Sequence, residues 1–166
     1  MTREEAVHRT PRVVGIIAVV VGVLSIIVGI STYVVVAKTL RDQQITVADD
    51  APFLAGKDVK GPFTAYAQAI ALNNHAHTIG GGKTYAELAK DDPARATVMT
   101  ADFLQASLYT SVVSFGVAVL IVVLGVMFLL FGAAVLELDR RTAAAAAGGT
   151  EPPGPEAHAD PVPAVS

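Results

Sequence analysis

The sequence predicts an all-α membrane protein in which two transmembrane helices form an antiparallel hairpin. A small helical extracytoplasmic domain connects these two helices. Two uncharged apolar runs, at 13–37 and 110–136, are the first observation behind this prediction. The second is that small residues recur every seven positions in both runs. The composition agrees, because only 16% of the residues are charged, whereas soluble domains usually contain about 25%.

The first apolar run, Val13 to Ala37, lies between Arg12 and Lys38 and contains 25 residues without a charge. As a helix it would be about 37 Å long, which exceeds the roughly 30 Å of hydrocarbon in a bilayer. A cleaved signal peptide is the alternative, but its apolar region usually spans only about 7–15 residues. We therefore expect an uncleaved transmembrane helix that follows a short cytoplasmic N-terminus at 1–12.

Small residues form a stripe on one face of each apolar run. The hydrophobic effect cannot drive helices together in lipid, so small side chains that let the backbones approach are typical of helix contacts there. We predict that the two stripes pack on each other as an antiparallel hairpin, and homodimer packing through one stripe is the alternative. The helix-packing residues are Gly15, Ala18, Gly22, Ser25 and Gly29 in the first run, and Ser111, Ala118, Gly125 and Gly132 in the second.

The segment 38–109 is predicted to form one mostly helical domain. Prolines and glycines predict a loop over 43–61. Pro62 suits the first turn of a helix, because that amide has no intrahelical partner, and Gly80 should end this helix. Three larger side chains share one helix face, and we expect them to face the outer ends of the spans and to be candidates for partner binding: Phe63, Tyr66 and Ile70.

The rest of this domain leads into the second apolar run. Thr84 and Glu87 have the spacing of a capping box, which predicts a further short helix over 85–90. Asp92 followed by Pro93 is a typical start signal for the next helix. The uncharged stretch then continues to Leu136 and is longer than a bilayer requires, so we assign the transmembrane part to 110–136.

The C-terminal segment 137–166 is rich in Ala, Gly and Pro, and we predict a disordered cytoplasmic tail. Basic residues near the helix ends favour both termini in the cytoplasm of a multi-pass plasma-membrane protein. Five lie on the terminal side, namely Arg3, Arg9, Arg12, Arg140 and Arg141, and three lie on the loop side, namely Lys38, Arg41 and Arg95.

Candidates for chemistry are few. The chain has no Cys, which excludes disulfides, thiolate catalysis and cysteine-ligated metals. The net charge of −3 and the lack of a basic run argue against nucleic acid as a partner. His75 and His77 point to different sides of a helix. They could bind a metal with Glu87 only if the helix frayed, so we predict no catalytic, cofactor or metal site.

The sequence from Gly81 to Leu88, followed by Asp92 to Thr100 and the second apolar run, resembles a family of small two-pass membrane proteins of actinobacteria. The resemblance covers roughly 10–136 and implies a membrane hairpin. Members are often labelled aromatic ring-opening dioxygenases. That label would imply a helical subunit of an iron enzyme.

The residues themselves favour a non-catalytic role. We predict an accessory or assembly factor of the cell envelope, embedded in the lipid bilayer, that binds another envelope protein or a second copy of itself and carries no cofactor. A subunit of a non-haem iron ring-opening dioxygenase, with His75 and His77 near the iron, is one alternative. A small oligomeric channel is another.

Overall fold

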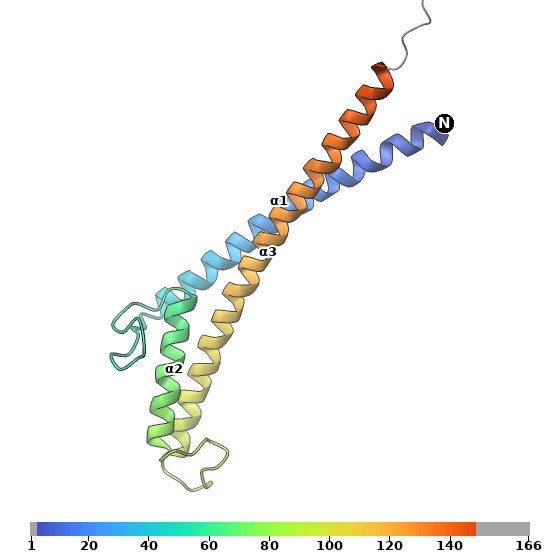
Figure 1. Ribbon diagram of the computed structural model, residues 1–166. Helices are drawn as coiled ribbons and strands as arrows, with labels where there is room; N and C mark the ends of the chain where they lie inside the picture. Colours follow the sequence, from blue (N-terminus) through green and yellow to red (C-terminus); the bar gives the residue numbers. More distant parts are fainter. Residues whose placement is uncertain (1–2, 149–166) are drawn as a thin grey trace, which may run out of the picture.

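The computed structural model describes residues 3–148, and this part of the chain forms three helices (Figure 1). They are α1 (Arg3–Asp42), α2 (Pro62–Ile79) and α3 (Arg95–Gly148). Helices α1 and α3 are long and antiparallel, and they cross and then diverge, while α2 lies beside the first part of α3 (Figure 1). The predicted all-α class is therefore confirmed.

Helices α1 and α3 pack against each other, as predicted for the two apolar runs. Both are long and apolar enough to cross a membrane, within Pro11–Asp42 and Arg95–Ala146. Only 22% of the most apolar window of α1 and 11% of that of α3 is buried. The apolar surface of these helices therefore faces outward, unlike that of a core helix in a soluble protein.

Helix α3 is continuous over 54 residues, which corresponds to about 80 Å at about 1.5 Å per residue. Its last turns correct the prediction of a disordered tail over 137–166, because the helix continues to Gly148. Alanine has the highest helix propensity of all residues, and five occur in a row here. Arg141 Nε also donates to Glu137 Oε1 at 2.8 Å, one turn away. The remainder of that segment, 149–166, lies outside the described residues.

Helix α2 begins at Pro62 and ends before Gly80, as the sequence predicts. At its start the Thr64 hydroxyl accepts the Gly61 N–H at 3.2 Å. At its end Gly81 and Gly82 have φ values of +60° and +82°, which glycine adopts without a Cβ clash. The chain can therefore reverse direction immediately after the helix.

The loop over 43–61 packs against the helices rather than standing free. Thr46 and Asp58 form an isolated antiparallel bridge. This pairing places Val47 and Val59 in the interior, where each is 1% exposed. The main buried cluster lies where this loop and all three helices meet, and it comprises Leu40, Val47, Val59, Ala65, Ala67, Ala69, Leu108 and Phe115. We call residues 43–109 the head.

The predicted helix over 85–90 is wrong, because the structure has a single turn there. Glu87 Oε2 does accept the Thr84 N–H at 2.8 Å, as a capping box requires. However, the guanidinium of Arg95 donates to the carbonyl oxygens of Tyr85 and Leu88. A helix leaves its last carbonyls without intrahelical partners, and Arg95 supplies hydrogen bonds to these two where the turn ends.

Candidate functional site

The contact between α1 and α3 is built on glycines that face each other across the two helices. A Cβ on Gly22 would lie 2.7 Å from the carbonyl oxygen of Gly125, and a Cβ on Gly125 would lie 2.8 Å from that of Gly22. Both distances are shorter than a carbon–oxygen contact permits. The two backbones therefore touch here, and contacts of this kind through glycine are also typical of membrane helices.

The same contact repeats one heptad away in each direction. A Cβ on Gly132 would lie 2.8 Å from the Gly15 carbonyl oxygen, and one on Gly29 would lie 2.8 Å from the Ala118 carbonyl oxygen. The other predicted packing residues differ in how far they are buried. Ala18 and Ala118 are buried, whereas Ser25 and Ser111 are half-buried. Both small-residue stripes are thus used within one chain.

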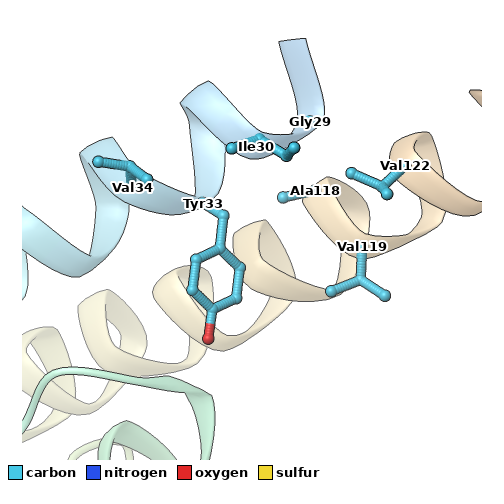
Figure 2. A pocket seen from close by; sticks show the side chains of 7 residues that line it. All are labelled: Gly29, Ile30, Tyr33, Val34, Ala118, Val119 and Val122. Atoms are coloured by element: carbon cyan, nitrogen blue, oxygen red, sulfur yellow. The ribbon is translucent and has the colours of Figure 1, made fainter. Parts of the chain in front are cut away.

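A shallow hollow of about 160 Å³ opens beside the Gly29 contact (Figure 2). Figure 2 shows Tyr33 lying between the two helices with its hydroxyl pointing away from the glycine. The Tyr33 ring meets the ring of buried Phe115 edge-on, with 4.8 Å between centroids. Apart from Tyr33 the lining consists of glycine and aliphatic residues, so the hollow is almost entirely apolar.

A larger groove of about 480 Å³ lies between the end of α1, α2 and α3. We call it the three-helix groove. No charged or titratable side chain lines it, so it is suited to binding rather than to acid–base chemistry. Its lining combines amides and hydroxyls with aliphatic side chains: Thr39, Gln43, Gln68, Ser107 and Ser111, with Leu40, Ile45, Leu72, Leu104 and Leu108.

The groove wall is held in place by a hydrogen bond from the loop to α2. The Ala48 N–H donates to Gln68 Oε1 at 2.8 Å. In the groove lining Leu104 is 50% exposed, and its neighbour in the chain, Phe103, is 68% exposed. Sequence reasoning missed this groove, because its walls come from three segments that are distant in the chain.

The structure does not bring the three predicted metal candidates together. His75 Nε2 lies 2.7 Å from Asp50 Oδ2, so this histidine links α2 to the loop. The hydrogen bond with His75 lowers the pKa of Asp50 from its usual value. Hydrogen bonds from Thr84 likewise lower the pKa of Glu87. Among the side chains that the structure describes, at 11–146, no three His, Asp or Glu are placed to hold one metal ion.

The predicted partner-binding side chains on α2 do not face inward as expected. Phe63 is 74% exposed, Tyr66 is also exposed, and Ile70 is half-buried. The buried positions of α2 are alanines, including Ala65 and Ala69. Alanines allow α2 to approach α3 closely, which leaves the larger side chains at the edges of the contact.

No family model, curated protein or solved structure matches this chain. The resemblance to actinobacterial two-pass membrane proteins therefore stays a prediction. The glycine contact and the three-helix groove are the features from which a function can be argued.

Proposed function

We propose that α1 and α3 cross the plasma membrane as an antiparallel hairpin, with both termini in the cytoplasm and the head outside. The exposed apolar surface along both helices supports this proposal. The glycine contact supports it as well, because close backbone approach through small residues is typical of helix packing in lipid. The excess of basic residues at the terminal ends favours the orientation.

This topology predicts which positions an impermeant thiol reagent can reach in intact cells. The chain has no Cys, so a single introduced cysteine is the only thiol in the protein that the reagent can label. We expect Asp58→Cys in the head to be labelled in intact cells, and Leu138→Cys to be labelled only after the membrane is permeabilised. Both side chains are exposed, which makes them a matched pair. Labelling of Leu138→Cys alone in intact cells would reverse the orientation.

Within this topology we propose a non-catalytic role: an accessory factor whose partner docks into the three-helix groove. The exposure of Phe103 and Leu104 is the observation that carries this proposal. Both lie on α3 outside the proposed transmembrane part, about 9 Å or more before its first residue at about 1.5 Å per residue. Large apolar side chains beside a groove are typical of protein interaction sites.

The shape of the groove indicates what kind of partner fits. A second hollow of about 280 Å³ shares Thr39 and Ser111 with the groove and extends to Ser114, within the proposed span. The combined surface therefore runs from the head into the outer part of the membrane. A helix of another membrane protein can lie along such a surface, with apolar side chains against Leu104 and polar ones near Gln68.

Site-specific photo-crosslinking in intact membranes tests the partner. With a photoreactive residue at Leu104 we expect one discrete adduct, whereas the same residue at Ala106, exposed on the other side of α3, should give none. Ser107→Trp, which fills the groove, should reduce the Leu104 adduct about tenfold, equivalent to about 1.4 kcal/mol.

The mass of the adduct distinguishes the possible outcomes. An adduct that mass spectrometry assigns to a different membrane protein supports the proposal. An adduct of twice the mass of this chain would instead assign the groove to a second copy. Equal adducts at Leu104 and Ala106, or none at either position, would overturn a partner in the groove.

A further inference from the structure

Aromatic rings from three separate segments meet on the head, on a face that the three-helix groove does not use. The Tyr66 and Tyr109 ring centroids are 6.0 Å apart, and those of Phe53 and Tyr66 are 6.2 Å apart. None of these residues lines the groove, whose α2 side chains are Gln68 and Leu72. We call Phe53, Leu54, Phe63, Tyr66 and Tyr109 the aromatic row.

The aromatic row is open to the surroundings rather than buried in the head. Phe53, Leu54, Tyr66 and Tyr109 are 37–43% exposed, and Phe63 is the most exposed member at 74%. Leu54 has a φ of +57°, which non-glycine residues rarely adopt. The loop thus turns sharply at a point where it presents two apolar side chains outward.

The position of the row along α3 fixes its height relative to the proposed membrane. Tyr109 immediately precedes the proposed span at 110–136. Helix α2 is antiparallel to α3, so the first turn of α2 points toward that span (Figure 1). Phe63 is therefore about 4.5 Å closer to the membrane centre than Tyr66, at about 1.5 Å per residue.

The buried cluster agrees with this height. The first turns of α2 pack on a cluster whose margin includes Val36, Ala37 and Val112. All three belong to the apolar runs. The N-terminal end of α2, with exposed Phe63, is thus level with the outer end of the proposed hairpin.

We infer that the aromatic row lies in the outer interface of the same bilayer, with Phe63 at the acyl boundary and the rings of Phe53, Tyr66 and Tyr109 among the headgroups. Aromatic side chains are enriched at this depth, because an apolar ring and a polar hydroxyl suit the two sides of the interface. The contact would fix the tilt of the head on the membrane and so orient the three-helix groove. This inference rests on the proposed membrane crossing.

The chain has no Trp, so a single Trp reports its own depth without background. We would place Phe63→Trp and Phe53→Trp, in separate full-length chains, in phosphatidylcholine vesicles that carry bromine either near the headgroup or deep in the acyl chain. Shallow bromine should quench both by at least about twofold and deep bromine less, since interfacial groups lie about 5–10 Å into the boundary.

Two controls separate the inference from the proposal on which it depends. Tyr85→Trp lies beyond the far end of α2, about 27 Å away along an 18-residue helix, and should not be quenched. Val123→Trp, exposed on α3 within the proposed span, should be quenched most by deep bromine. Because the vesicles hold only this chain, the sole protein that could cover the row is a second copy.

Each pattern of quenching has one reading. Quenching at Val123→Trp without quenching at Phe63→Trp and Phe53→Trp overturns the inference and leaves the membrane crossing intact. No quenching at any position overturns both. A blue-shifted but unquenched Phe63→Trp would show that a second copy covers the row, which also overturns the inference.

Discussion

Gly22→Ile is expected to separate α1 from α3 and to destabilise the hairpin. The Cβ alone would lie 2.7 Å from the Gly125 carbonyl oxygen and 2.9 Å from the Leu129 backbone nitrogen. Backbone atoms on a continuous helix cannot rotate away as a side chain can. The cost should therefore reach or exceed the roughly 1–3 kcal/mol that is typical of overpacking.

Gly116→Ile provides the matched control for this prediction. Like Gly22 in α1, Gly116 in α3 lies within a helix, but an added Cβ at Gly116 would have no heavy atom within 4 Å. We would measure the free energy of unfolding in detergent, together with the distance between spin labels at Val14 and Leu138. Gly22→Ile should lengthen that distance and Gly116→Ile should not. Equal effects of the two variants would contradict the glycine contact as the basis of the hairpin.

The hairpin is the part of the fold that the sequence predicts best. Glycines repeated every seven residues define one face of a helix regardless of what lies opposite, so Gly22 and Gly125 could each be assigned to a packing face. Which glycine meets which could not be predicted, because the register depends on how both helices fit together. The structure supplies the pairing of Gly22 with Gly125.

Local signals were sufficient for the ends of α2 and for the start of α3 after Asp92, and misleading at two other places. Pro62 and Gly80 act on the backbone directly, so they mark the helix correctly. The Thr84 capping box forms as predicted, but the chain makes only one turn there, and the Arg95 guanidinium, later in the chain, donates to the Tyr85 carbonyl oxygen. Composition likewise predicts a tail that includes the alanines before Gly148, although alanine favours a helix and α3 extends through them.

The candidate site was harder to predict from the sequence than the hairpin. The helical spacing of the larger side chains predicts that Phe63 and Tyr66 face inward, whereas the buried positions of α2 are alanines such as Ala65 and Ala69. Residue size is thus a poor guide where helices approach closely. The groove depends on Gln68 and segments far from it in sequence, so no single stretch carries a signal for it.

Phe115→Ala should produce the second large effect, at the point where the hairpin meets the head. Phe115 is 1% exposed, contacts the Tyr33 ring edge-on, and belongs to the same buried cluster as Val47 and Val59. Truncation of a buried Phe typically costs about 3–5 kcal/mol. We expect a loss of this size in detergent unfolding, whereas Phe128→Ala, exposed on the same helix, should cost less than about 1 kcal/mol.

A second measurement shows that the effect of Phe115→Ala reaches the head. Val47 and Val59 hold the loop over 43–61 against the cluster, and Lys57 in this loop is exposed. Loss of the Phe115 ring should release the loop locally, so trypsin should cleave after Lys57 faster in Phe115→Ala than in the native chain or in Gly22→Ile. If the glycine variant accelerates this cleavage equally, the head and the hairpin open as one unit and Phe115 is no separate junction between them.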